Sequence, residues 1–231
     1  MDKLIVALDV DSSAEALDLS DQLQGVVGGF KIGNRLFCAE GPPLVRRMVT
    51  QGHQVFLDLK YHDIPSTVAA AVHAAADLGV WMLTVHATGG YDMLVAAKEA
   101  AANQDKGPKL IAVTVLTSFD DTILRGLGVS RSVPQQVEAL ARLAQSAGVD
   151  GVVASPLEIG SIREACGNDF LVVTPGIRNR TTDQMHDQKR TMDAASAIAA
   201  GSSYLVVGRP ITAAPDPRGA AAQIGKQITQ A

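Results

Sequence analysis

Cysteine and aromatic residues are scarce in this chain of 231 residues. The two cysteines, Cys38 and Cys166, are far apart and show no CxxC spacing. This argues against a disulfide framework and against a zinc site, and it suits a reducing compartment. We expect both thiols to be packed against other residues. Aromatic residues make up only 4% of the chain although 47% of it is hydrophobic, so the core is expected to be aliphatic.

Excess charge and long apolar runs are also lacking. The net charge is −4, from 24 acidic and 20 basic residues. That balance provides no excess of positive charge that would bind nucleic acid or an anionic membrane. No apolar run reaches the length of a membrane span, and the N-terminus enters a strand without a signal-like apolar region. We therefore expect a cytoplasmic protein that binds neither nucleic acid nor membrane.

Short apolar runs alternate with helix-like segments along the whole chain. The expected strands cover residues 4–8, 30–32, 55–57, 82–86, 110–116, 151–154, 171–174 and 204–207. The expected helices cover about 12–23, 42–51, 65–79, 90–103, 134–147, 158–165, 194–200 and 218–228, with a short one near 120–125. Continuously apolar strands are typical of parallel strands buried on both faces. Eight such units favour an α/β fold, a (β/α)8 TIM barrel forming a single domain over residues 1–231, although doubly wound sheets share the alternation.

The stretch QVFLDLKYHDIPST at residues 54–67 concentrates charge at the end of a strand. Asp58 and Lys60 are two residues apart, so strand alternation places their side chains on one face. Pro65 lies where a helix would begin, and Asp63 is placed to cap that helix. Lys60 is expected to stay protonated because nearby carboxylates favour the ammonium form. A surface ion-pair cluster is the alternative, but charges at the carboxyl ends of parallel strands favour a functional site.

Polar and charged residues also follow most of the other expected strands. In a barrel these ends meet at the C-terminal rim, where the sites of this fold lie. The rim residues are Asp9, Lys31, Asp58, Lys60, His86, Thr117, Ser118, Arg178 and Arg209. Thr117 and Ser118 are interpreted either as hydrogen-bonding groups for a heterocycle or as a turn or cap. We expect His86 to be packed or hydrogen-bonded rather than catalytic, and His62 to face away from Lys60.

Glycine and arginine follow the seventh and eighth expected strands, as Pro175-Gly176-Ile177-Arg178 and Gly208-Arg209. These two loops are the usual phosphate site of barrel enzymes. Glycine lets a backbone N–H approach an anion closely, and arginine offers a planar fork of donors. Arginines in surface ion pairs are the alternative. The polar segment 179–189 predicts a mobile lid, or else a plain disordered loop.

These motifs together resemble one known family. The run LDLKYHDIPSTV resembles the active-site signature of the orotidine 5′-monophosphate decarboxylases. Further similar motifs, in the order of that family, are VALDV (6–10), KIG (31–33), LTS (116–118), TPGIR (174–178), DQKR (187–190) and VVGRPI (206–211). The DxKxxD pattern alone is shared with a wider barrel superfamily. Its combination with HDIP, PGIR and VGRPI is much narrower, and the motifs cover nearly the whole chain.

The resemblance implies a homodimeric barrel that needs no cofactor and no metal. Its reaction would convert orotidine 5′-monophosphate to UMP and CO₂, the last step of de novo pyrimidine nucleotide biosynthesis. Lys60 would donate a proton to C6 of the pyrimidine, and Asp58 would lie beside the departing carboxylate. Asp63, Ile64 and Thr67 would reach the site of the neighbouring subunit. The other implied substrate-binding residues are Asp9 and Lys31 at the ribose, Thr117 near the pyrimidine, Arg178, Gly208 and Arg209 at the phosphate, and Gln188 between base and phosphate.

The chemistry of the residues is compatible with this resemblance. Loss of CO₂ from C6 leaves a carbanion that cannot delocalise into the ring π-system, and a fixed ammonium such as that of Lys60 would stabilise it. One alternative is a magnesium-dependent sugar-phosphate decarboxylase or aldolase of the same superfamily, such as one acting on 3-keto-L-gulonate 6-phosphate. Activity that survives EDTA would argue against it. A non-catalytic sensor of phosphate ligands is a second alternative, against which the intact set of Asp58, Lys60 and Asp63 argues.

Overall fold

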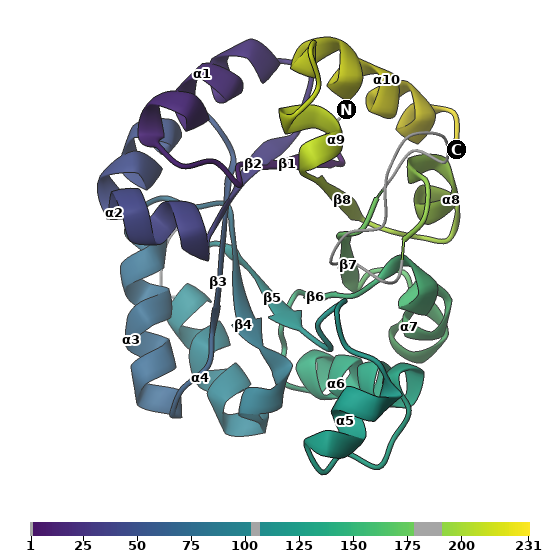
Figure 1. The fold of residues 1–231 in the computed structure, drawn as a ribbon. Coiled ribbons are helices and arrows are strands. Elements are labelled where there is room, and N and C mark those ends of the chain that lie inside the picture. The colour runs from purple at the N-terminus through teal and green to yellow at the C-terminus, as the bar shows by residue number, and fades with distance from the viewer. Residues whose placement is uncertain (1, 103–106, 178–190) are drawn as a thin grey trace.

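The computed structural model describes residues 2–102, 107–177 and 191–231, which form a closed barrel of parallel strands (Figure 1). The strands are β1 (Leu4–Ala7), β2 (Gly29–Gly33), β3 (Val55–Tyr61), β4 (Met82–His86), β5 (Lys109–Val113), β6 (Gly151–Val153), β7 (Leu171–Thr174) and β8 (Tyr204–Val207). Each pairs with the next in chain order, and β8 closes the barrel on β1. The predicted (β/α)8 barrel is confirmed.

The helices surround the strands as an outer ring (Figure 1). They are α1 (Ser13–Leu23), α2 (Asn34–Thr50), α3 (Pro65–Ala76), α4 (Tyr91–Ala102), α5 (Asp121–Gly126), α6 (Val133–Ser146), α7 (Ile159–Cys166), α8 (Ala194–Ala199), α9 (Arg209–Thr212) and α10 (Pro217–Thr229), with 3-10 turns η1 (Ala87–Gly89) and η2 (Pro156–Glu158). None of the helices within the described ranges combines the length and the apolar character that crossing a bilayer requires.

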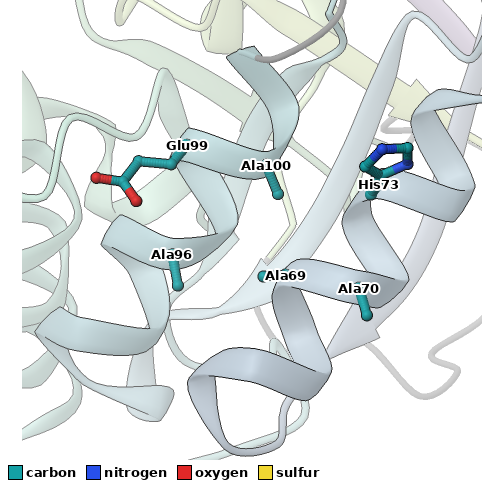
Figure 2. Close-up of a pocket in the computed structure, with 6 residues that line it drawn as sticks. All are labelled: Ala69, Ala70, His73, Ala96, Glu99 and Ala100. Carbon is teal, nitrogen blue, oxygen red and sulfur yellow. The ribbon is translucent and has the colours of Figure 1, made fainter.

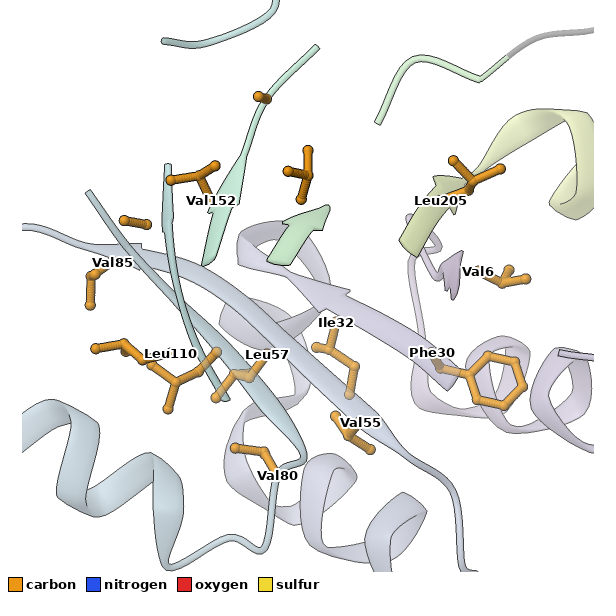
Figure 3. Close-up of a cluster of buried hydrophobic side chains, with 14 of the residues drawn as sticks. Val6, Phe30, Ile32, Val55, Leu57, Val80, Val85, Leu110, Val152 and Leu205 are labelled. Atoms are coloured by element: carbon orange, nitrogen blue, oxygen red, sulfur yellow. The ribbon is translucent and has the colours of Figure 1, made fainter. Parts of the chain in front are cut away.

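Two hydrophobic layers lie on either side of the strands because successive strand residues point to opposite faces. In β1, Ile5 and Ala7 belong to a small cluster made of strand residues, whereas Leu4 and Val6 belong to the large cluster shared with the helices. Figure 3 shows part of the large cluster, in which nearly all side chains are aliphatic. The prediction of an aliphatic core is confirmed.

The structure corrects the predicted start of the second helix and the end of the fifth strand. Helix α2 begins at Asn34 rather than at residue 42, and it is kinked at Gly41, where φ is 64°. The Gly-Pro-Pro sequence starts only the second half of this helix, because proline suits a first turn and glycine tolerates the positive φ. Strand β5 ends at Val113 rather than at 116, and the chain then turns so that Phe119 N donates to Leu116 O.

The kinked helix α2 also decides the environment of Cys38. The helix buries Leu36 and Met48, among others, against the barrel. Cys38 follows Leu36 by two residues, and residues at that spacing lie on different faces of a helix. Cys38 is therefore exposed, and the prediction that it is packed is wrong. Cys166 is buried as predicted, and burial raises the pKa of its thiol.

Candidate active site

The charged end of strand β3 departs from regular pairing with strand β4. Leu57 pairs with Leu83 and Tyr61 pairs with Val85, so three residues of β3 face the single residue Thr84 of β4. This irregularity is a β-bulge, a feature that redirects side chains beside active sites. Within it, Lys60 has φ of 55°, and it is the only non-glycine residue with positive φ among the residues described. The bulge therefore sets the direction of the Lys60 side chain.

Asp58 lies at the centre of the charged residues and is only 9% exposed. Its Oδ1 accepts a hydrogen bond from Lys60 Nζ at 2.8 Å and one from Thr84 Oγ1 at 3.0 Å. Its Oδ2 lies 3.4 Å from Lys31 Nζ. The prediction that Asp58 and Lys60 point the same way is confirmed, although a bulge rather than a regular strand brings them together.

The charges continue from Asp58 across the first strands of the barrel. Lys31, on β2, also lies 3.4 Å from Oδ1 of Asp9, which follows β1. The ends of β1, β2 and β3 thus carry the alternating series Asp9, Lys31, Asp58 and Lys60. These four predicted rim residues are brought together at the C-terminal ends of the strands, where barrel enzymes place their sites.

Burial by itself would raise the pKa of Asp58, but other contributions outweigh it. The positive charges of Lys31 and Lys60, with the hydrogen bonds from Lys60 and Thr84, hold the pKa of Asp58 below its ordinary value of 3.8. Opposite charges and hydrogen bonds to the charged form both favour the carboxylate. Asp58 is therefore an anion at neutral pH, although it is almost entirely shielded from solvent.

Two histidines lie side by side next to this series. The ring of His86, at the end of β4, is 5.6 Å from the ring of His62, with the planes tilted by 35°. Burial lowers the pKa of His86, the charges of His62 and Lys60 lower it further, and the charge of Asp58 opposes them. His86 is therefore neutral at pH 7, in line with the expectation of a packed histidine.

The segment after β3 projects into solvent. Asp63, Ile64 and Thr67 are all exposed, and Ile64 is 64% exposed despite its apolar side chain. Helix α3 has Ile64 at its N-cap and no side-chain cap, while Asp63 Oδ1 accepts from Ile64 N at 2.6 Å. The prediction that Asp63 caps the helix is wrong, because the carboxylate bonds the adjacent N–H rather than one inside the first turn. Among the described residues, no ion pair joins Asp63 to Lys60.

The structure also describes Gly208, Arg209 and Thr117 among the remaining predicted site residues. Gly208 follows β8, and Arg209 begins the short helix α9. A Cβ atom added at Gly208 would lie 3.7 Å from Asp9 Oδ2, so this loop lies beside the charged series. Thr117, in the turn after β5, is half-buried. Arg178, Gln188 and the lid predicted over 179–189 lie outside the described residues.

A shallow groove of about 530 Å³ lies between α3 and α4, on the outside of the barrel (Figure 2). It is lined by Ala69, Ala70, His73, Ala96, Glu99 and Ala100. None of these is a predicted site residue. Within the described ranges, no group of three or more His, Cys, Asp or Glu side chains is arranged to hold a metal ion.

Thr84 is the member of this site that sequence reasoning missed. It is a polar residue in the otherwise apolar strand run MLTV, and it is fully buried. A buried hydroxyl needs hydrogen-bond partners. That requirement was the one available signal, but it did not reveal which groups Thr84 would bind.

A closed barrel with alternating lysines and carboxylates at its strand ends places the protein in the class of (β/α)8 barrels, whose enzymes carry their sites at the C-terminal rim. The family model described as "Orotidine 5′-phosphate decarboxylase / HUMPS family" matches residues 2–224. The chain belongs to this family, and the resemblance drawn from the motifs is confirmed.

Individual relatives agree with the family match. The chain is 52% identical over 234 residues to an orotidine 5′-phosphate decarboxylase from Syntrophotalea carbinolica, covering 99% of this chain and 96% of the relative. It is 53% identical over 233 residues to the protein of the same name from Moorella thermoacetica, covering 98% and 92%. The crystal structure of orotidine 5′-phosphate decarboxylase from Lactobacillus acidophilus matches with a TM-score of 0.85 and 39% identity, over 97% of this chain and 98% of that one.

Proposed function

We propose that Lys60 and its charged neighbours perform the reaction of this family, the decarboxylation of orotidine 5′-monophosphate to UMP and CO₂. The chain is a carboxy-lyase of pyrimidine nucleotide biosynthesis. The residue assignment rests on the position of the Lys60 ammonium, which lies 2.8 Å from the buried carboxylate of Asp58. The side chain of Lys60 is still 30% exposed at the barrel mouth. The magnesium-dependent sugar-phosphate alternative is not favoured, since curated relatives at about half identity carry the decarboxylase name.

Lys60 acts at the carbon that loses CO₂. The bond between C6 and the carboxylate breaks, CO₂ leaves, and the electron pair stays on C6 in the plane of the ring. A prearranged positive charge at that point stabilises the pair, and such electrostatic terms are usually the largest in catalysis. The proton then passes from Lys60 Nζ to C6, which gives UMP and leaves a neutral amine that regains its proton from solvent.

Asp58 keeps Lys60 in place and lies beside the substrate carboxylate. Its negative charge at neutral pH, supported by Lys31 and Thr84, holds the ammonium of Lys60 by a direct hydrogen bond. The same charge repels a substrate carboxylate placed next to it. Departure of CO₂ relieves that repulsion, so the enzyme binds the transition state better than the ground state.

The rest of the substrate lies along the other strand ends. Asp9 and Lys31 bind the ribose hydroxyls, Thr117 contacts the pyrimidine, and Gly208 and Arg209 bind the phosphate. Arg178 joins the phosphate site, and Gln188 links base and phosphate; both lie outside the described residues. The proximity of Gly208 to Asp9 supports adjacent ribose and phosphate sites. Binding energy from the remote phosphate then lowers the barrier at C6.

The enzyme is a homodimer in the cytoplasm with active sites shared between subunits. Asp63, Ile64 and Thr67 contribute to the site of the partner subunit. The exposed apolar side chains of Ile64 and of Tyr91, at the start of α4 and 50% exposed, support an interface beside the rim. Exposed apolar patches on soluble proteins mark such contacts. The two free cysteines suit a reducing compartment.

The variant Lys60→Ala tests the assignment. Loss of substrate ultraviolet absorbance measures turnover, and calorimetry measures binding of UMP. We expect turnover to fall by more than about 10³-fold, because both charge stabilisation and the proton donor are removed, while UMP still binds. Lys98→Ala is the control, since Lys98 pairs with Asp150 at 2.6 Å outside the rim. Near-normal turnover in Lys60→Ala would rule out the assigned role.

A further inference from the structure

Thr84 occupies the position opposite the β3 bulge, where its hydroxyl both donates and accepts a hydrogen bond. Its Oγ1 donates to Asp58 Oδ1 at 3.0 Å and accepts from Lys60 N at 2.9 Å. The residue is 0% exposed, so no solvent molecule reaches the hydroxyl to replace either bond. Within the described part of the chain, Thr84 is therefore the side chain that hydrogen-bonds both the backbone of Lys60 and the carboxylate that holds the Lys60 ammonium.

We propose that Thr84 is a positioning residue for decarboxylation, which fixes the backbone and the ammonium of Lys60 through its single hydroxyl. This inference rests on the proposed roles of Lys60 and Asp58. Thr84 does not contact the reacting carbon in this proposal. It acts by holding the two groups that do the chemistry in one geometry.

The backbone of Lys60 explains why such a support is needed. The backbone of Lys60 has φ of 55°, which lies in the left-handed region that residues with a Cβ atom rarely occupy. Residues held there persist only when their surroundings fix them. The hydrogen bond from Lys60 N to Thr84 Oγ1 takes the place of the regular strand pairing that the bulge interrupts. Threonine suits this task, because its β-branched side chain has few accessible rotamers.

The same hydroxyl tunes the charge of Asp58. Asp58 faces Lys31 from β2, Lys60 from its own strand and Thr84 from β4, and its charge acts on His86 at the end of β4. Of the three groups that face Asp58, Thr84 is the uncharged one. Its hydrogen bond favours the carboxylate form, so its removal raises the pKa of Asp58 and moves the acid limb of the pH–rate profile to higher pH.

Three variants test the proposal. Thr84→Val keeps the shape and removes the hydroxyl, Thr84→Ser keeps the hydroxyl, and Thr114→Val is the matched control. Thr114 is also a buried threonine, 3% exposed, and its hydroxyl donates to Val153 O at 2.9 Å rather than to Asp58. All three are assayed by ultraviolet absorbance from pH 2.5 to 9, a range that reaches below the ordinary pKa of 3.8 for Asp58, with thermal melts to compare stability.

We expect kcat of Thr84→Val to fall by about 10- to 100-fold, while KM changes by less than about threefold, because a small displacement of a catalytic group slows the chemical step. The acid limb should move to higher pH. Thr84→Ser should restore kcat to within about fivefold of the wild type, and Thr114→Val should lose comparable stability with little loss of kcat. If Thr84→Val does not fold, Thr84→Cys replaces it, and its weak thiol donor should give a kcat below that of Thr84→Ser.

Three results would overturn the inference. A Thr84→Val enzyme with wild-type kcat and an unmoved acid limb, beside an inactive Lys60→Ala, would refute the role of Thr84 and leave the role of Lys60 standing. Normal turnover by Lys60→Ala would instead remove the roles of both residues. A drop in kcat that equals that of Thr114→Val would show that Thr84 acts only through stability.

Discussion

Lys31 Nζ lies 3.4 Å from Oδ2 of Asp58, the carboxylate oxygen that Lys60 does not contact. The two side chains come from neighbouring strands, and each is 12% exposed, so solvent and salt screen the pair only weakly. Because burial alone would favour the neutral acid, the charge of Asp58 depends on its two lysines. Together with the hydrogen bond from Thr84, the two lysines therefore set the charged state of the site.

A variant that lacks one of these lysines provides the first prediction. Lys31→Met should raise the pKa of Asp58, since the charge of Lys31 is the largest of the effects that lower it. In the wild type, the lowered pKa gives stability that is present above the ordinary value of 3.8 and is lost as pH falls through the folded value. A higher folded pKa shrinks that stabilisation, so acid unfolding should begin at a higher pH. Circular dichroism during an acid titration measures the midpoint.

Arg142→Met provides the matched control for Lys31→Met. It removes an ion pair with Glu138 at 3.0 Å and a hydrogen bond to Ala165 O at 3.0 Å, and the side chains of Arg142 and Glu138 are 56% and 41% exposed. Exposed pairs of this kind contribute less than about 1 kcal/mol. The acid midpoint of Arg142→Met should therefore stay close to that of the wild type. An equal displacement in the two variants would contradict the coupling between Lys31 and Asp58.

The second prediction concerns the shared active site. Lys60→Ala and Asp63→Asn should each be impaired alone, and mixing them should restore activity. A mixed dimer contains one intact site, built from Lys60 of one subunit and Asp63 of the other. Random exchange makes half of the dimers mixed, so recovery should approach about a quarter of wild-type activity. Turnover after verified subunit exchange is the measurement.

A mixture of Lys60→Ala with Asp58→Asn is the control for this experiment. Lys60 and Asp58 belong to the same strand of one subunit and hydrogen-bond each other, so exchange creates no intact site. This mixture should remain inactive. If the mixture with Asp63→Asn also stayed inactive, the proposed action of Asp63 across the interface would be refuted.

The sequence predicts the fold better than it predicts the details of the site. Eight apolar runs and their spacing are enough for the barrel, because parallel strands buried on both faces leave a clear pattern. Asp9, Lys31, Asp58 and Lys60 could be predicted as rim residues for a similar reason, since each lies at or just after the end of an apolar run.

The geometry that joins these residues could not be predicted in the same way. The bulge in β3 arises from pairing with β4, so the positive φ of Lys60 and the role of Thr84 depend on contacts between strands distant in sequence. The exposure of Cys38 depends likewise on the start of α2 at Asn34, which the chain's local pattern does not reveal. Local patterns give the elements and their charges, whereas bulges and kinks follow from how the elements pack.

The third prediction concerns stability at the amino-terminal end of the barrel, opposite the rim. Arg163, in α7, donates two hydrogen bonds to Gly201 O, at 2.9 and 2.7 Å, and another to Gly167 O at 2.9 Å. It also donates to Ser203 Oγ at 3.1 Å, which in turn accepts from Val172 N of β7. One guanidinium thus joins the segments that lead into β7 and β8.

Arg163→Met should lower the free energy of unfolding by roughly 2 to 4 kcal/mol, because several backbone carbonyls lose a charged donor at once. Arg163→Lys should rescue only part of this loss, since an ammonium cannot reproduce the planar fork that serves acceptors on two segments.

Urea unfolding of these variants, with Arg142→Met as the exposed control, measures the differences. The kcat of folded Arg163→Met should match the wild type because Arg163 lies at the far end of the strands from Lys60. Equal stability of Arg163→Met and Arg142→Met would show that solvent replaces these hydrogen bonds without loss, and a lowered kcat would show that the two ends of the barrel are coupled.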